Sequence, residues 1–314
     1  MYAHIIRRLL YMIVVLFIMS AIVFSLMSLV TGDPVVMMLG QDADKETVEK
    51  IRERLGLNRP IIVQYADWIS HVIKGDLGAS YTMPMTVCEL ILQRLPVTVE
   101  LTLLSITFSL LVAIPLGIIA AIKFNSKIDI FLLSYTVAGI SMPNFWIGIL
   151  LIFLFSLELR ILPASGYVSF LTSPLENLKL MILPVLTLSA WYIAVYLRFT
   201  RSTFIEGLRS EYILVARSKG ILEKRVLWVH AFKNTLIPLV TVIGMTISGL
   251  FGGAVVTETI FALPGIGRLL VDAIFARDLP LIEGIVLLIT VSVVFCNLIV
   301  DIVYVYIDPR IRYE

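Results

Sequence analysis

The sequence predicts an all-α membrane protein with six transmembrane helices. Of its 314 residues, 59% are hydrophobic and 15% are charged, and its mean hydropathy is +0.97. Soluble domains carry about 25% charged residues. A helix needs roughly 20 apolar residues to cross a hydrocarbon core about 30 Å thick. Six runs of the sequence reach this length: 9–30, 99–122, 131–157, 180–197, 236–256 and 281–307.

The basic residues predict that both chain termini lie in the cytoplasm. With the N-terminus inside, the inner segments hold 14 of the 25 Lys and Arg residues. Of the 11 outer ones, 7 lie in the single long segment 31–98. Long loops cross the membrane largely regardless of charge, whereas basic residues in short loops stay inside. The short loops therefore favour this orientation by 14 to 4.

Three regions are predicted along the chain. Residues 1–30 form the cytoplasmic N-terminus and the first transmembrane helix, and 31–98 form a small extracytoplasmic helical cap. Residues 99–314 form a core of five transmembrane helices with a cytoplasmic loop at 198–235.

The predicted cap contains signals for three helices. Apolar residues at helical spacing end at Gly56, a second helix runs from Pro60 to Gly75, and a third covers 87–95 before Pro96. Such a surface could receive a soluble partner, or it could be a compact plug without a recognition role. The sequence leaves both open.

The cytoplasmic loop contains a short helix with signals at both ends. Ser210 can cap its N-terminus, Glu211 suits its first turn, Lys219 suits its last turn, and Gly220 can adopt the left-handed conformation that ends it. The spacing of the next residues places one group on a common face: Tyr212, Val215 and Ala216. A stiff helix fixed to membrane spans at both ends could act as a lever, but an interfacial helix looks similar.

Several motifs resemble one family along nearly the whole chain. Within the loop they are Glu211-Tyr212, Ala216-Arg217, Lys219-Gly220, His230-Ala231 and 234–238. Elsewhere they are GDP at 32–34, LGL at 55–57, RLPVTVEL at 94–101, ISMPNF at 140–145, ETIFALPGIGR at 258–268 and NLIVDIVYVYIDPRIR at 297–312. These segments resemble the ABC importer permeases of the dipeptide, oligopeptide and nickel class, the inner-membrane components of binding-protein-dependent transport.

The resemblance implies the type I ABC importer permease fold, in a bacterial inner membrane. It implies alternating access for small peptides, including di- and oligopeptides or glutathione-like compounds. The expected partners are a second, homologous permease subunit in a heterodimer, two cytoplasmic ATPase subunits and an extracytoplasmic solute-binding protein, with no nucleic acid.

In this family the cytoplasmic loop docks into a groove of the ATPase. The residues that the resemblance assigns to ATPase coupling are Glu211, Tyr212, Val215, Ala216, Arg217, Lys219 and Gly220. The sequence departs from the wider superfamily pattern of Glu-Ala-Ala, three residues and Gly, because Leu214, Val215 and Ala216 stand before Gly220. The departure leaves open which side chain fills the groove.

Small and proline residues of the core are candidates for helix packing or for the pathway. Gly244, Ser248 and Gly252 recur every four residues, a spacing that permits close helix contact in lipid. They could instead line a conduit. Pro143 should kink the third span and could shape a cavity. Asp301 lies deep in the last span and should either pair with a neighbouring polar side chain or contact substrate.

The sequence predicts no enzyme and no cofactor in this chain. Its three histidines are scattered, no H-E-x-x-H motif occurs, and we expect neither a metal site nor a catalytic residue. No phosphate-binding G-x-x-x-x-G-K-[ST] loop occurs, so ATP and magnesium should bind the separate ATPase subunits. Import of nickel or another metal chelate is the first alternative. An ion-coupled secondary transporter, which would need no ATPase, is the second.

Overall fold

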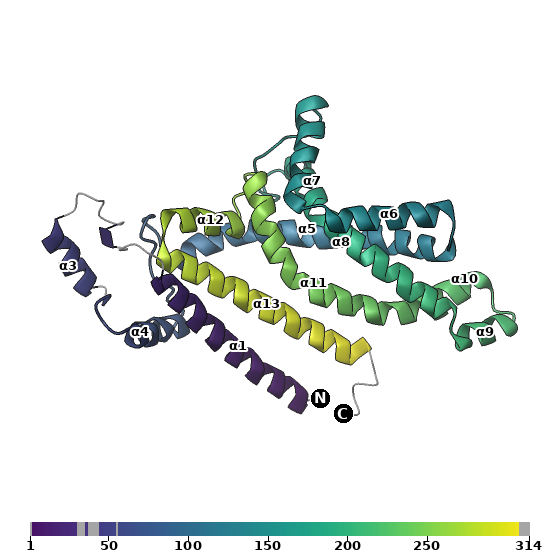
Figure 1. The fold of residues 1–314 in the computed structure, drawn as a ribbon, viewed down its shortest axis with the longest axis horizontal. Coiled ribbons are helices and arrows are strands. Elements are labelled where there is room, and N and C mark those ends of the chain that lie inside the picture. Colours follow the sequence, from purple (N-terminus) through teal and green to yellow (C-terminus); the bar gives the residue numbers. More distant parts are fainter. Residues whose placement is uncertain (1, 30–34, 37–43, 55, 308–314) are drawn as a thin grey trace. The chain divides into compact units, whose positions relative to one another are not determined.

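A computed structural model of the protein describes residues 2–29, 35–36, 44–54 and 56–307. All named elements of this part are helical, and Figure 1 shows their order along the chain. The α-helices are α1 (Tyr2–Leu29), α3 (Lys45–Arg54), α4 (Ile61–Ile73), α5 (Val87–Ile122), α6 (Lys127–Ser141), α7 (Asn144–Leu151), α8 (Pro174–Leu208), α9 (Glu211–Ser218), α10 (Glu223–Arg225), α11 (Phe232–Ile260), α12 (Ile266–Ala276) and α13 (Leu279–Ile307). Two π-helical segments are η1 (Ile152–Glu158) and η2 (Val226–Ala231).

Three helices in the described residues are long and apolar enough to cross a membrane, in α5, α8 and α13. Two bent pairs raise the number to as many as five: α6 with α7–η1, and the two halves of α11. Within α1 the apolar stretch is the shorter Leu10–Ser25. The described structure therefore supports three to five spans where the sequence predicted six.

The span predicted at 131–157 is bent at Pro143, where a kink was expected, and the bend divides it into two helices. Helix α6 ends at Ser141, α7 starts at Asn144, and the two meet at 106° (Figure 1). Pro143 lies in the break as the residue that caps α7, with φ −65° and an extended ψ of 137°. Proline lacks an N–H and excludes the preceding residue from the helical region, so the helix cannot pass through Met142. The break opens the wall of a cavity.

The chain divides into two compact units, Met1–Val97 with Pro264–Val294, and Thr98–Leu263 with Phe295–Glu314. The N-terminal segment of the first unit ends at Val97. That unit also includes a distant segment, around α12 and the start of α13, that the sequence did not connect with it.

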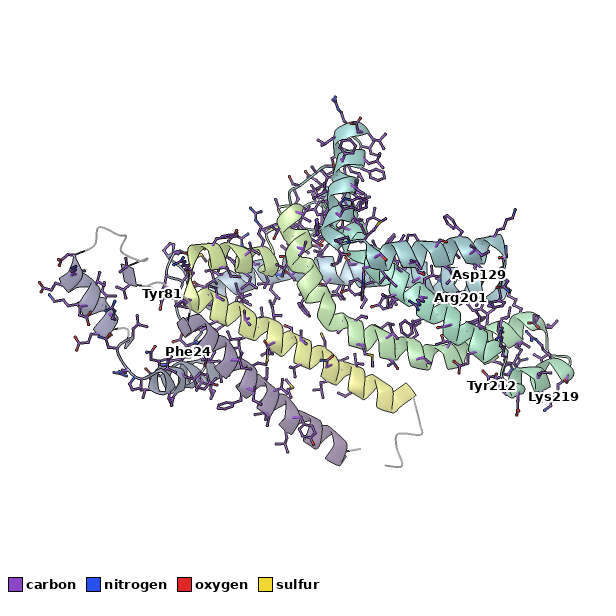
Figure 2. The ribbon with its side chains drawn as sticks, viewed as in Figure 1. Phe24, Tyr81, Asp129, Arg201, Tyr212 and Lys219 are labelled. Atoms are coloured by element: carbon purple, nitrogen blue, oxygen red, sulfur yellow. The ribbon has the colours of Figure 1, made fainter. Side chains whose placement is uncertain are left out.

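In the first unit, α1 and α4 pack through aromatic and hydroxyl groups. The Ser20 and Tyr65 hydroxyl oxygens lie 2.8 Å apart, and Phe24 (Figure 2) contacts the rings of Tyr65 and Trp68. The helix predicted from Pro60 to Gly75 is thus α4, and Gly75 has a φ of +85°. The helix predicted at 87–95 is not separate, because α5 continues through Pro96 to Ile122.

The segment before α5 is held by one buried carboxylate of the same unit. Asp278 is 0% exposed and accepts hydrogen bonds from the Ser80 and Thr82 hydroxyls and from two backbone N–H groups, those of Thr82 and Leu281. Tyr81 (Figure 2), which stands between Ser80 and Thr82 in the sequence, is largely buried, and this burial raises its pKa to about 12. These bonds fix the loop against the start of α13.

In the second unit, α8 is the most buried of the three long spans. Small residues allow its neighbours to approach closely. A Cβ placed on Gly139 of α6 would lie 2.9 Å from Ala194, and one on Gly117 of α5 would lie 2.7 Å from Thr200. In lipid no hydrophobic effect brings helices together, so close packing at small residues drives their association instead. Helix α8 therefore organises this unit.

Candidate functional site

The short helix predicted in the loop exists as α9, and its end has the predicted geometry. Gly220 has a φ of +73°, its N–H donates to the Arg217 carbonyl at 2.9 Å, and the Ile221 N–H donates to the Ala216 carbonyl at 3.3 Å. This pair of bonds is a Schellman motif, in which glycine takes the left-handed position. At the other end Ser210 occupies the capping position, but its hydroxyl forms no cap and donates to the Gly207 carbonyl.

Helix α9 divides into a buried face and an exposed face. Ile213 is 0% exposed and Ala216 is 6% exposed, and both pack with Phe204 of α8 and with the end of α5. Tyr212 and Val215 are 40% and 52% exposed. Of the three residues predicted on one docking face, two are therefore open to a partner, while Ala216 faces its own chain. Ile213, the side chain that anchors α9 to α5 and α8, was not predicted. A short helix between two spans needs such an anchor, and its apolar residues could have suggested it.

An ion pair closes the turn after α9. The Arg217 guanidinium donates to both carboxylate oxygens of Glu223 on α10, at 2.6 Å and 3.1 Å. The hydrogen bond with Arg217 lowers the pKa of Glu223, and the same bond raises the pKa of Arg217. Lys219 and Glu211 lie at opposite ends of α9, and Figure 2 labels Tyr212, next to Glu211, and Lys219 beside this helix. The ion pair thus joins the end of α9 to α10.

A second, buried ion pair fixes the start of α6 to α8. Arg201 donates from Nε to Oδ1 of Asp129 at 2.5 Å and from Nη2 to Oδ2 at 2.8 Å (Figure 2). The same carboxylate accepts the Asn125 N–H at 3.0 Å. The Phe124 ring lies 5.4 Å from the Arg201 guanidinium and 5.3 Å from that of Arg209. This cluster was not predicted from the sequence, although opposite charges at two span ends on the same side could have indicated it.

A cavity of about 590 Å³ lies beside the break between α6 and α7. Its walls come from that break, from α8 and from α11. The lining residues are Ile140, Ser141, Met142, Pro143, Asn144, Trp191, Tyr192, Met245, Thr246, Gly249 and Gly253. Its volume falls in the range of about 300–1,000 Å³ that is usual for small-molecule sites.

The structure distributes the predicted pathway residues among different surroundings. Pro143 lines the cavity. Gly244 is a packing residue, because a Cβ there would lie 2.2 Å from the Val300 side chain of α13. Gly252 is exposed and faces open space, while its neighbours Gly249 and Gly253 line the cavity. Ser248 and Asp301 lie in α11 and α13, but their side chains are outside the described part of the structure.

Among the described residues, no group of three or more His, Cys, Asp or Glu side chains could hold a metal ion. The two cysteines are both free, Cys88 exposed and Cys296 partly buried.

Comparisons with known proteins identify the class. Residues 113–313 match the family model of the binding-protein-dependent transport system inner membrane component, and residues 1–102 match the model of its N-terminal region. A putative peptide transport system permease protein of Brucella abortus is 44% identical over 314 residues, covering 100% of both chains. The glutathione transport system permease protein GsiC of Escherichia coli is 39% identical over 311 residues, covering 99% of both.

A third relative, the dipeptide transport system permease protein DppB of Alkalihalophilus pseudofirmus, is 38% identical and covered in full. These similarities define a membrane-embedded permease of an ABC importer, which is a transport subunit rather than an enzyme. The chain belongs to the family of binding-protein-dependent transport system inner membrane components. The resemblance read from its motifs is thereby confirmed.

Proposed function

We propose that this permease subunit imports small peptides by alternating access, driven by ATPase subunits that dock on α9. The observation that carries the proposal is the two-sided burial of α9. Its Ile213 and Ala216 are fixed in a core shared with α5 and α8, while Tyr212 and Val215 remain exposed. A partner that pushes the exposed face must therefore move the helices that bear the buried face.

The cargo is proposed from the names of full-length relatives, which describe peptide, dipeptide and glutathione transport. All are at least 38% identical to this chain over nearly its whole length. Small peptides therefore come before metal chelates.

The proposed assembly pairs this chain with a second, homologous permease subunit, two ATPase subunits and a solute-binding protein. We place it in a bacterial inner membrane with both termini in the cytoplasm, because the short loops on that side carry most of the basic residues. In this orientation α9 and α10 face the ATPases. Helices α3 and α4 then form the cap on the outer face, where the binding protein would dock.

The proposed six spans are those of the type I permease fold. They are α1, α5, the bent α6–α7 pair, α8, α11 and α13. Counting α1 as a span requires its apolar stretch, Leu10–Ser25, to be extended by flanking residues of the same helix.

Alternating access follows from a two-state equilibrium that the ATPase shifts. ATP-driven closure of the ATPase dimer would push α9 and turn the pathway outward, and hydrolysis would return it. The ATPase would contact the exposed side chains of α9, so Glu211, Arg217 and Lys219 contribute charge to this interface. Gly220 fixes the end of α9, which acts as the lever.

The decisive variant is Gly220→Pro in the complete transporter reconstituted in vesicles with its partners. Proline cannot adopt the φ of +73° and removes the N–H that bonds to Arg217. We expect the protein to insert normally, while peptide uptake per ATP hydrolysed falls sharply. Retained uptake would contradict the lever, and uptake without any ATPase would contradict the whole function.

The matched control is Gly75→Pro. Gly75 has a φ of +85°, its N–H donates to the Val72 carbonyl at 2.9 Å, and a Cβ would meet nothing within 4 Å, as at Gly220. The two substitutions therefore cause the same local strain at different places. Only the Gly220 variant should lose the coupling between hydrolysis and uptake.

A further inference from the structure

The cavity beside the α6–α7 break contains polar groups that the protein leaves without partners. Tyr192 is 3% exposed, yet its hydroxyl forms no hydrogen bond within the described part of the chain. The Asn144 carboxamide and the Trp191 indole N–H also form none with the described residues. A donor or acceptor that has no partner in the protein is available to a molecule that enters the cavity.

Other hydroxyls of the lining are already satisfied. Thr246 Oγ1 lies 2.8 Å from the Tyr196 hydroxyl, and Ser141 Oγ donates to the Val137 carbonyl at 2.8 Å. The unsatisfied groups are thus a specific subset of the lining.

A glycine leaves room for a ligand at the Tyr192 hydroxyl. A Cβ on Gly249 would lie 3.3 Å from the Tyr192 hydroxyl oxygen, and one on Gly253 would lie 3.7 Å from the Asn144 amide nitrogen. Both glycines line the cavity. A side chain at Gly249 would crowd the Tyr192 hydroxyl, so glycine there keeps the hydroxyl accessible. At Gly253 a Cβ would first meet Leu188 Cδ1 at 2.8 Å, so that glycine serves the packing of α11 on α8.

The lining selects the chemistry of the ligand. None of the described lining residues is Lys, Arg, His, Asp or Glu. Burying a charged group without an opposite charge is very costly, so an ammonium, a carboxylate or a metal ion has no partner here. A peptide group is neutral, with one donor and one acceptor that match the acceptor and donor of the Asn144 carboxamide. The Trp191 ring adds an apolar surface beside them.

We propose that this cavity is a cargo-contact site that binds one neutral peptide group of the passing substrate, through the Asn144 carboxamide and the Tyr192 hydroxyl, against the Trp191 ring. The inference rests on the proposed peptide transport and specifies the residues that recognise the backbone. Recognition of the backbone alone would make the site tolerant of different side chains.

The test compares tri-alanine with an analogue whose internal amide nitrogen is methylated, in vesicles containing the complete transporter. Tyr192→Phe removes the hydroxyl but keeps the ring, and Asn144→Leu replaces the carboxamide by an apolar group of similar shape. We expect each to lower kcat/KM for tri-alanine by about 5-fold, the effect of losing one net hydrogen bond. We also expect each to reduce the discrimination against the methylated analogue.

The matched control is Tyr196→Phe, the same change one turn along α8, where the hydroxyl already has Thr246 as its partner. It should leave the discrimination between the two peptides unchanged. Since the same binding protein delivers cargo to every variant, a change in discrimination reports on the permease. Tyr192→Phe and Asn144→Leu variants that discriminate like the wild type would overturn the proposal.

A photo-crosslinking amino acid at Trp191 gives an independent readout. Labelling by radioactive tri-alanine during turnover, blocked by excess unlabelled peptide, would support the site. Cross-linking to a second permease subunit instead would make the cavity a subunit interface and refute the inference. If the wild-type transporter takes up no peptide, the proposed function fails as well, whereas normal uptake with indifferent variants refutes this inference alone.

Discussion

The substitution Asp129→Asn should open the contact between the start of α6 and α8. The carboxylate accepts two bonds from Arg201 and one from the Asn125 N–H, and its side chain is 2% exposed against 15% for Arg201. Asparagine keeps one acceptor oxygen but turns an N–H₂ group toward the guanidinium. The charge of Arg201 is then left without its partner.

The expected cost follows from the burial of the pair. Removing one partner of a buried ion pair costs about 3–5 kcal/mol. Arg201 retains some contact with solvent, so we expect the lower end, about 3 kcal/mol of unfolding free energy. Since each 1.4 kcal/mol is a factor of 10, roughly a 100-fold rise in the opening of this contact should follow. The Phe124 ring, which lies beside two guanidinium groups, should loosen with it.

Two measurements check this prediction. Thermal unfolding of the purified protein should shift to lower temperature. Trypsin should also cut faster at the turn between α5 and α6, because Lys123 and Lys127 flank Phe124.

The control is Asp272→Asn, the same change in a pair whose side chains are 41% and 59% exposed and whose N–O distance is 3.9 Å. Exposed pairs contribute about 0–1 kcal/mol. Equal unfolding and equal tryptic cleavage of the Asp129 and Asp272 variants would refute the reasoning.

Three further variants test other contacts by unfolding of the purified protein. Asp278→Asn removes a buried carboxylate that accepts four hydrogen bonds. It should lower the free energy of unfolding by about 1.5–3 kcal/mol, the worth of one hydrogen bond to a charged group. A change below about 0.5 kcal/mol would contradict the role of Asp278 as the anchor of its loop. Burial and a 2.9 Å hydrogen bond to Glu100 raise the pKa of Tyr167 to about 12. The contribution of this side chain to folding stability is therefore present below its ordinary pKa of 10.0 and is lost as the pH rises toward 12. Tyr167→Phe should remove that part of the alkaline loss of stability, and an unchanged dependence of unfolding on pH would contradict this. Gly244→Ala should cost about 1–3 kcal/mol through overpacking against Val300, and Val300→Ala should restore the loss; a missing rescue would show that the clash lies elsewhere.

The ends of helices were predictable where single residues determine them. Gly220, Gly56 and Gly75 all have the positive φ that their places after helical segments indicated. Pro143 was predicted to interrupt its span, but the sequence could not give the angle of 106°, which depends on how α7 packs against α8 and α11. A proline only removes a hydrogen bond and restricts its neighbour, whereas packing determines how far the two helices diverge.

The candidate site was predictable only in part. The glycine pattern of α11 indicated close contacts, yet it could not separate Gly244, which packs on Val300, from Gly249 and Gly253, which line the cavity. That distinction depends on which face of α11 meets α13 and which meets α8. Likewise, the face of α9 that contacts its own chain is determined by Ile213, whose partners come from helices distant in the sequence.

The sequence alone determined that this chain is helical and resides in a membrane, and its motifs placed it in its permease family. It also determined that a short helix ending at Gly220 lies between two spans. Composition, apolar run lengths, motifs and terminal glycines are local properties that the sequence shows directly. Only the tertiary structure decided which groups meet. The pairing of Asp129 with Arg201 and the cavity of Asn144, Trp191 and Tyr192 join segments separated by dozens of residues. Such contacts arise from the packing of whole helix faces, which local patterns do not specify.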